Sequence, residues 1–217
     1  MKPYFQEGDI TIYNSDCRDV LPHVGRFDLC LTDPPYGIGA SKMTLGNGLR
    51  VVERGDADWD AERPSVAIFT LARAVCKNSV VWGGNYFADI LGASRGWLVW
   101  DKGTGDNDYA DCELAWSDLD TVVKKYFRSW VGVNAKESAD PDRFHPTQKP
   151  VELMLWCIQK AKNPQSVIDP FLGSGTTLVA CKKLGIRGVG IEREEKYCEL
   201  AVKRILNTTP SLFSEER

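Results

Sequence analysis

The tetrad Asp33-Pro34-Pro35-Tyr36 is the first group of residues whose types could do chemistry. It stands directly behind an apolar run at residues 27–31 that is typical of a buried strand. Asp33 and the Pro34 carbonyl could each accept one N–H of a planar amino group, while Tyr36 stacks on the ring that carries it. For the tetrad alone, a Pro-Pro turn with Asp33 as a cap is an equal alternative.

A second loop follows the apolar residues 167–168 and reads Asp169-Pro170-Phe171-Leu172-Gly173-Ser174-Gly175-Thr176-Thr177. Its glycines would let a ligand approach the main chain, and a helix starting at Thr176 or Thr177 would offer backbone amides to an anion. A phosphate loop needs lysine where Thr176 stands, and the dinucleotide pattern fails at Leu178. The pattern therefore favours a carboxylate or amino-acid moiety, although each glycine alone could equally be a cap or a tight turn.

Glu192 ends the next expected strand and lies 19 positions after Gly173. At about this offset, an acidic residue meets ribose hydroxyls in related α/β folds. A ligand that is both nucleoside and amino acid is S-adenosylmethionine, which we therefore expect as the cofactor. Its methyl sulfonium would suit the first site, because an exocyclic amino group on adenine or cytosine is a weak nucleophile that needs positioning. Such a base would have to leave the duplex.

The elements expected to position these loops are those of an α/β fold, in which short apolar runs alternate with helical patterns. We predict a Rossmann-like, mostly parallel sheet with helices on both faces. The expected strands are 10–13, 28–32, 79–82, 97–101, 112–116, 121–126, 167–169 and 188–191, and the expected helices are 64–75, 151–162, 176–184 and 194–206. Short connections predict that the strands at 97–126 pair antiparallel as a hairpin at one sheet edge.

The composition predicts one domain over residues 1–217, with 43% hydrophobic residues to build its core. No apolar run is long enough to span a membrane and the first residues lack the layout of a secretory signal, so we expect a cytoplasmic protein. None of the seven cysteines forms a C-x-x-C pair with another, which predicts reduced thiols and no metal site.

A net charge of −3 counts mildly against a nucleic-acid partner for the chain as a whole. Local cations are nevertheless present in the long segment 38–63, where Lys42, Arg50 and Arg54 could contact phosphates or simply be solvated.

The two loops together resemble those of the amino-group DNA methyltransferases, which make N6-methyladenine or N4-methylcytosine. Residues 33–36 match the family's catalytic D/N/S-P-P-Y/F/W element, and residues 169–175 match its cofactor element, an acidic residue followed by F-x-G-x-G. The element that resembles the catalytic loop comes first in the chain, as in the permuted β branch of the family. Release-factor methyltransferases, which act on glutamine, carry the cofactor loop first, so the order argues against a glutamine substrate. The segment 145–150 resembles the family segment that packs against the methionine end of the cofactor, and the turn 14–17 resembles the one in which Asp16 accepts the cofactor's adenine amino group. Trp100-Asp101-Lys102 resembles the family's W-x-K element.

The resemblance implies a catalytic loop at residues 33–36 and an S-adenosylmethionine site. The cofactor-binding residues expected from the loop and the resemblance are Asp16, Cys17, His145, Thr147, Lys149, Asp169, Pro170, Phe171, Gly173, Ser174, Gly175, Thr176, Thr177 and Glu192. DNA is the implied partner, and a homodimer and a cognate restriction enzyme are compatible with the family. Asp33, in place of serine, favours adenine N6 over cytosine N4.

Two features keep other functions open. The only segments available for target recognition are 38–63 and part of 101–148, so the recognised site could be short or loosely read. The same small region and the acidic net charge suit a non-catalytic subunit of a larger methylation complex, although such a subunit would not need the tetrad. An RNA-directed methyltransferase would need the same pocket.

Overall fold

The computed structural model describes residues 1–39, 60, 62–104, 110–129 and 148–210. Within these residues, nine strands form one sheet in the order β1-β2-β9-β8-β3-β4-β6-β5-β7. The strands are β1 (Phe5–Glu7), β2 (Ile10–Asn14), β3 (Phe27–Thr32), β4 (Cys76–Trp82), β5 (Leu98–Asp101), β6 (Cys112–Ser117), β7 (Lys124–Phe127), β8 (Ser166–Asp169) and β9 (Arg187–Glu192). The five strands from β2 to β4 in this order are parallel, whereas β1 and β6 run the other way.

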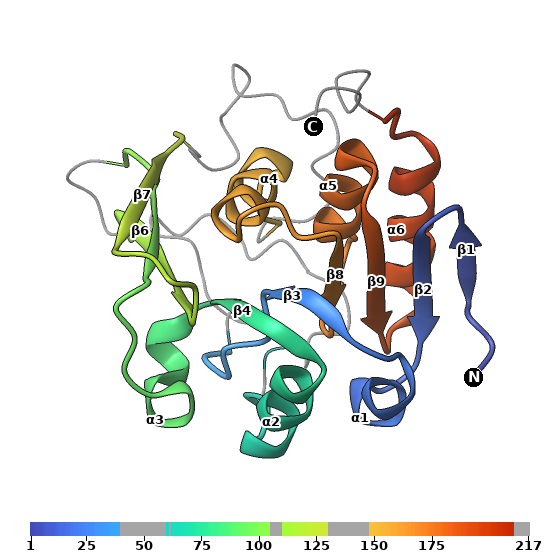
Figure 1. Cartoon of the computed structure of the whole chain (residues 1–217), viewed down its shortest axis with the longest axis horizontal. Helices are drawn as coiled ribbons and strands as arrows, with labels where there is room; N and C mark the ends of the chain where they lie inside the picture. Colours follow the sequence, from blue (N-terminus) through green and yellow to red (C-terminus); the bar gives the residue numbers. More distant parts are fainter. Residues whose placement is uncertain (40–59, 61, 105–109, 130–147, 211–217) are drawn as a thin grey trace, which may run out of the picture.

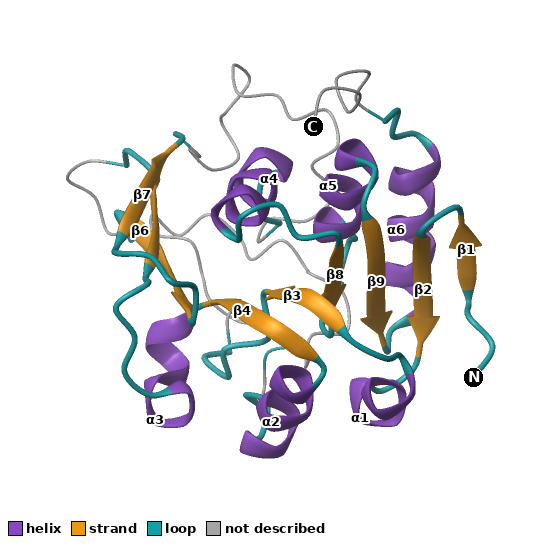
Figure 2. Cartoon of the chain, in the orientation of Figure 1, coloured by secondary structure: helices purple, strands orange, loops and turns teal. Residues whose placement is uncertain are grey.

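Helices cover both faces of the sheet (Figure 1; Figure 2). They are α1 (Cys17–Val20), α2 (Val66–Ala74), α3 (Ala88–Leu91), α4 (Val151–Lys160), α5 (Thr176–Leu184) and α6 (Glu195–Leu206), with short 3-10 turns η1 (Leu21–His23) and η3 (Gly84–Phe87). The largest buried apolar cluster joins the sheet to α4, α5 and α6, and two smaller clusters join it to α1, α2 and α3 on the opposite side. The predicted α/β class with helices on both faces is confirmed.

The parallel register decides where the functional loops meet. Central strands such as β3 and β8 are buried on both faces and read as short apolar runs, as expected for a parallel sheet. Because β3, β8 and β9 are adjacent and parallel, their carboxyl ends lie at one edge of the sheet. Asp33 follows β3, while Asp169 and Glu192 are the last residues of β8 and β9. Ligands of open α/β sheets bind outside such strand ends.

The predicted antiparallel hairpin is confirmed for β5 and β6, but the third strand was placed wrongly. β6 already bonds β4 on one side and β5 on the other, so it has no free edge for β7. β7 instead adds to the outer edge of β5 and is parallel to it. The chain reverses its direction between β6 and β7. Because β5 is also antiparallel to β6, β5 and β7 run in the same direction. The edge strand β1 was not predicted.

The lengths and compositions of the described helices bear on whether they could lie in a membrane. Within the described part of the chain, none of them is both long enough and apolar enough to cross a bilayer.

Candidate active site

A cavity of about 1000 Å³ lies at the carboxyl ends of β3, β8 and β9. Both loops singled out in the sequence contribute to its wall. Of the predicted site residues, those that line it are Asp16, Cys17, Asp33, Pro34, Pro35, Tyr36, Lys149, Asp169, Pro170, Phe171, Gly173, Ser174, Thr176, Thr177 and Glu192. A cavity of this size can hold a nucleoside-sized ligand and part of a second one.

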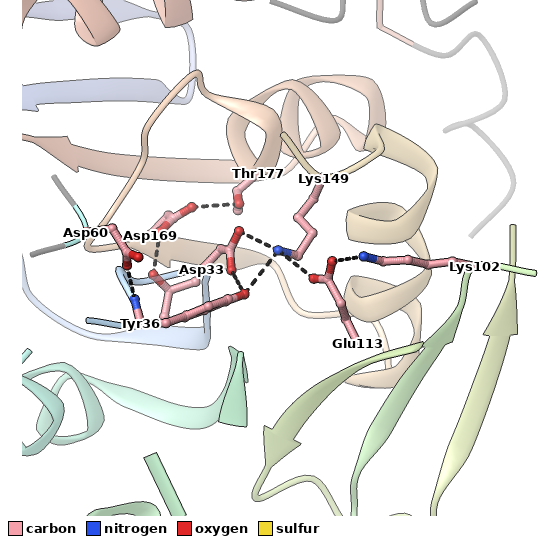
Figure 3. A network of polar contacts seen from close by, with 9 residues as sticks. Asp33, Tyr36, Asp60, Lys102, Glu113, Lys149, Asp169 and Thr177 are labelled. Atoms are coloured by element: carbon pink, nitrogen blue, oxygen red, sulfur yellow. Dashed lines mark hydrogen bonds and ion pairs between the residues drawn. The ribbon is translucent and has the colours of Figure 1, made fainter. Parts of the chain in front are cut away.

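Asp33 is held by two side chains on its two oxygens (Figure 3). The Tyr36 hydroxyl donates to Oδ1 over 2.6 Å, and the Lys149 ammonium donates to Oδ2 over 2.7 Å. An ionised carboxylate has about four lone-pair positions, so each oxygen can accept one more hydrogen bond. Asp33 is thus fixed in orientation and retains the capacity to accept an N–H from a ligand in the cavity.

The Tyr36 ring lines the cavity and packs against neighbouring residues. Its ring stacks on Tyr86, with centroids 4.9 Å apart and an interplanar angle of 18°. Burial, together with the charge of Asp33, holds the pKa of the Tyr36 hydroxyl well above its ordinary value. The ring also lies over Gly83, where an added Cβ would come within 2.1 Å of the tyrosine Cε1 atom. Only glycine therefore lets Tyr36 take this position.

The main chain of the loop that contains Asp33 and Tyr36 is fixed by Asp60, a residue that no sequence pattern singles out. Asp60 is 1% exposed, and its Oδ1 accepts hydrogen bonds from the backbone N–H groups of Tyr36 at 2.6 Å and Gly37 at 3.0 Å. Two backbone donors on one carboxylate oxygen form a strong, directional clamp. The bend after the two prolines is thus set by a carboxylate from a distant part of the chain.

Lys149 was expected at the cofactor and lines the same cavity as the glycine loop 169–177, but its ammonium contacts the Asp33 carboxylate. The side chain is 6% exposed and forms ion pairs with Asp33 at 2.7 Å and Glu113 at 3.0 Å. Burial works to lower the pKa of Lys149, but the charges of Asp33 and Glu113 outweigh it and hold the pKa well above its ordinary value. Lys149 is therefore a buried cation between two carboxylates.

Asp169 joins the second loop to the first. Its Oδ1 accepts hydrogen bonds from the Thr32 hydroxyl at 2.7 Å and the Phe171 amide at 3.1 Å, and its Oδ2 accepts one from the Thr177 hydroxyl at 2.7 Å. Burial raises the pKa of Asp169 to about 6, and the bonds from Thr177 and Thr32 only partly oppose this effect. Asp169 therefore shapes the loop from inside while lining the cavity.

The glycine turn of the second loop is held from two sides. The Gly173 amide donates to Glu192 Oε2 over 2.9 Å, and a Cβ at Gly173 would meet only open space, which leaves room for close approach of a ligand. Gly175 does not line the cavity: a Cβ there would lie 2.7 Å from the Ala201 Cβ atom, so this glycine allows α6 to pack close to the turn. Burial raises the pKa of Glu192.

Arg204 supports the same turn and was also missed. It is 4% exposed on α6, and its Nη1 donates to the Ser174 carbonyl at 2.6 Å and to the Thr176 hydroxyl at 3.0 Å. A buried guanidinium behind the turn fixes the main chain that borders the cavity.

Comparisons with known proteins agree with this geometry. The family model for DNA methylases of the N6 and N4 type matches residues 93–203, just over half of the chain. The chain belongs to this family. It is an S-adenosylmethionine-dependent enzyme that methylates amino groups of DNA bases.

Individual relatives extend over nearly the whole length. The type II methyltransferase M2.MboI of Moraxella bovis is 24% identical, covering 99% of this chain and 95% of the relative. M2.DpnII of Streptococcus pneumoniae is 25% identical, covering 94% and 92%. The crystal structure of an M1.HpyAVI–SAM complex superposes with a TM-score of 0.58 at 26% identity, covering 91% of this chain and 99% of the other. The predicted methyltransferase fold is confirmed.

The chemistry of the cavity suits the cofactor of the methylase. S-adenosylmethionine, when bound, supplies a methyl group on a cationic sulfonium. Asp33, Asp169 and Glu192 are among the acidic residues that line the cavity, and Gly173 leaves an open approach, which suits a ligand with cationic groups and an amino-acid end.

Asp16 of the methylase was expected to accept the cofactor's adenine amino group, and its carboxylate lines the cavity. In the structure it caps α1 and binds Arg18, accepting from the backbone N at 2.8 Å and from the guanidinium Nη2 at 2.6 Å. The side-chain bond from Arg18 lowers the pKa of Asp16 to about 2. Its Oδ2 accepts from a guanidinium at the surface, where such a contact exchanges easily with a ligand.

Five predicted site residues lie outside the described part of the chain. They are His145 and Thr147, expected at the cofactor, and Lys42, Arg50 and Arg54, expected at DNA.

Proposed function

We propose that this methylase transfers its methyl group to the N6 atom of adenine in DNA, with the base unstacked from the duplex; cytosine N4 is the alternative. The observation that carries this proposal is that Asp33 and Tyr36 line the same cavity as Gly173 and Glu192. One pocket thus contains both an acceptor for an amino group and a site suited to the cofactor. A base inside a duplex could not enter it.

The proposed role of Asp33 is to accept one N–H of the target amino group. The carboxylate is oriented by Tyr36 and Lys149 and can still accept such a bond. The Pro34 carbonyl is proposed to accept the second N–H, and Pro35 fixes the bend that aims it. Together these acceptors would turn the nitrogen lone pair out of the ring and toward the methyl donor. Positioning and local electrostatics then supply most of the rate acceleration.

The cofactor contacts are proposed on the lining residues. We assign the amino-acid end to the Gly173 turn and Asp169, because backbone amides and a buried carboxylate can bind its carboxylate and ammonium. We assign the ribose to Glu192 and the adenine to Asp16. His145 and Thr147 retain their proposed cofactor contacts from the sequence.

The choice of adenine rests on Asp33, since aspartate in this loop favours adenine among the amino-group DNA methyltransferases.

The alignment with M2.MboI is longer than the 217 residues of this chain, so the relative contains segments that this chain lacks. This supports a short or loosely read recognition site, contacted by Lys42, Arg50 and Arg54. A homodimer would enlarge the DNA contact, and the type II relatives support a companion restriction enzyme.

The test is to incubate unmodified duplex DNA with the protein and S-adenosylmethionine, digest the DNA, and measure methylated nucleosides by mass spectrometry. We expect N6-methyladenine; N4-methylcytosine without N6-methyladenine would overturn the adenine assignment. Asp33→Ala should abolish product while S-adenosylmethionine still binds in calorimetry, and the exposed Asp120→Ala should change neither. Single-stranded DNA and RNA, assayed in parallel, should yield less product than duplex DNA.

A further inference from the structure

Glu113 is a carboxylate in the active-site cavity to which the mechanism above assigns no role. It lies on β6, outside both functional loops, and lines the cavity. It contacts Lys149 at 3.0 Å on one side and forms an ion pair with Lys102 on the other. Its side chain retains 25% of its accessible surface, so Glu113 borders the space in which the ligands would lie.

The charges around Glu113 alternate along a single row (Figure 3). Lys102 contacts Glu113, Glu113 contacts Lys149, and Lys149 contacts Asp33. Two cations and two anions leave the row neutral, which limits its effect on a cationic ligand in the cavity. A buried ammonium is costly unless it is paired, so Lys149 depends on both of its carboxylates.

We propose that Glu113 is a positioning residue for methyl transfer, acting through Lys149 to hold the Asp33 carboxylate in its oriented, charge-balanced state. This inference rests on the proposed function of Asp33 as the acceptor of the target amino group. With Glu113 in place, Lys149 is shared between two carboxylates, and Asp33 keeps accepting capacity for the base. Without its charge, Lys149 depends on Asp33 alone, and the row gains a net positive charge beside the cationic methyl donor.

The protonation states of the row support this arrangement. Burial acts to raise the pKa of Glu113, but the ammonium groups of Lys149 and Lys102 outweigh it and lower the pKa to about 2. Loss of this charge removes one of the groups that keep the pKa of Lys149 high. Among the described residues, the groups that face the Lys149 ammonium are Asp33 and Tyr36 after β3, Trp82 on β4, Glu113 on β6 and the Cys157 thiol on α4.

The test compares the wild-type protein with Glu113→Gln, which keeps the shape of the side chain and removes its charge. Single-turnover methyl transfer from tritiated S-adenosylmethionine to unmodified duplex DNA is measured from pH 6 to pH 9. We expect the variant to be at least tenfold slower at pH 8. The glutamine amide can still accept a hydrogen bond from Lys149, but it does not supply the lost negative charge. We also expect its rate to begin falling at a lower pH than the wild-type rate does, because loss of one of the two carboxylate charges lowers the pKa of Lys149.

Controls separate positioning from folding. Glu152→Gln removes another ion-paired carboxylate, which contacts Arg128 and does not line the cavity, and should leave rate and pH profile unchanged. Glu113→Asp should restore the wild-type pH profile, because it returns the charge. If Glu113→Gln does not fold, Glu113→Asp still tests the role, since its shorter side chain draws the carboxylate away from Lys149 and should slow transfer; a wild-type rate in this variant would overturn the proposal.

The outcomes are distinct. A wild-type protein that methylates no DNA overturns the proposed function. A wild-type protein that methylates DNA, with a Glu113→Gln variant of equal rate and equal pH profile, overturns the role of Glu113. A slower variant whose pH profile matches the wild-type profile also overturns it, because a purely structural defect would give that result.

Discussion

The Thr32 hydroxyl donates a hydrogen bond to Asp169 Oδ1 over 2.7 Å, although 137 positions separate the two residues. Thr32 is the last residue of β3 and directly precedes the tetrad 33–36, whereas Asp169 ends the neighbouring strand β8 and starts the glycine loop 169–177. The bond is buried at the point where the two loops diverge. The relative position of the two loops is therefore fixed by a side-chain contact as well as by the sheet.

The buried position of Asp169 predicts a pH-dependent stability. Its pKa is raised from the ordinary 3.8 to about 6, so between these values the folded chain holds a proton that the unfolded chain has released. The free energy of unfolding should therefore fall as pH rises through this window, by up to roughly 3 kcal/mol from this group. Asp169→Asn removes the titration and can still bond Thr32 and Thr177.

Urea unfolding without cofactor, at several pH values from 4 to 7.5, checks this prediction. The variant should gain stability relative to the wild-type protein as pH rises, and the gain should level off above about pH 7. Asp120→Asn, at a carboxylate whose side chain is 83% exposed, should show no such trend. A difference between Asp169→Asn and wild type that stays constant with pH would contradict the shifted titration.

Arg204 should control cofactor affinity without touching the cofactor. Arg204→Met removes the hydrogen bonds to the Ser174 carbonyl and the Thr176 hydroxyl, so the turn that borders the cavity loses its support. Charged hydrogen bonds of this kind contribute about 1.5–3 kcal/mol, so we expect a roughly tenfold or larger rise in the Kd for S-adenosylmethionine. Isothermal titration calorimetry measures it. The exposed Arg95→Met is the control, and an unchanged Kd in a folded Arg204→Met variant would refute the role.

Most of the fold could be predicted because it depends on local patterns. The helix at 176–184 was predicted to the residue, since its start at the glycine turn and its apolar spacing are both visible in the sequence. The pairing of β7 was not, because it depends on which strand edge remains free after β4, β5 and β6 have assembled. Such a competition between edges leaves no mark in the sequence of β7.

The site divides in the same way. The two loops could be recognised because their residue types and their order in the chain are typical of amino-group methylation. The residues that hold these loops in place could not be recognised in the same way. Arg204 had a detectable signal, since it lies three residues after Ala201 on the buried face of α6. Gly83 and Gly84 after an apolar strand also mark a turn. Asp60 and Glu113 had none: each is a single acidic residue whose role comes only from distant partners.

Asp60 should affect the chemical step more than cofactor binding. Asp60→Ala leaves the backbone N–H groups of Tyr36 and Gly37 without the carboxylate that fixes the catalytic bend. We expect the single-turnover rate to fall at least about tenfold, since 1.4 kcal/mol of lost positioning is sufficient for that factor. The Kd for S-adenosylmethionine should change little. Asp60→Asn, which keeps one acceptor oxygen, should recover much of the rate, and equal losses in both variants would contradict this account.

Gly83 provides a test of the position of the Tyr36 ring. Its backbone is left-handed, with φ 68° and ψ 23°, and Gly185 at the end of α5 is similar, with φ 64° and ψ 35°. Alanine at either position should cost about 1–2 kcal/mol of unfolding free energy for the backbone alone. Only at Gly83 would the new Cβ collide with Tyr36, because a Cβ at Gly185 meets nothing within 4 Å.

Gly83→Ala should therefore displace the ring and slow methyl transfer at least roughly tenfold, as expected when a positioned group moves by about 1 Å. Gly185→Ala, with a similar loss of stability in thermal unfolding, should keep nearly the wild-type rate. The rates are compared in single turnover at saturating S-adenosylmethionine and DNA. Equal rates in the two variants would mean that the position of the Tyr36 ring over Gly83 is not the position used in catalysis. The ring would then have to move before the base binds.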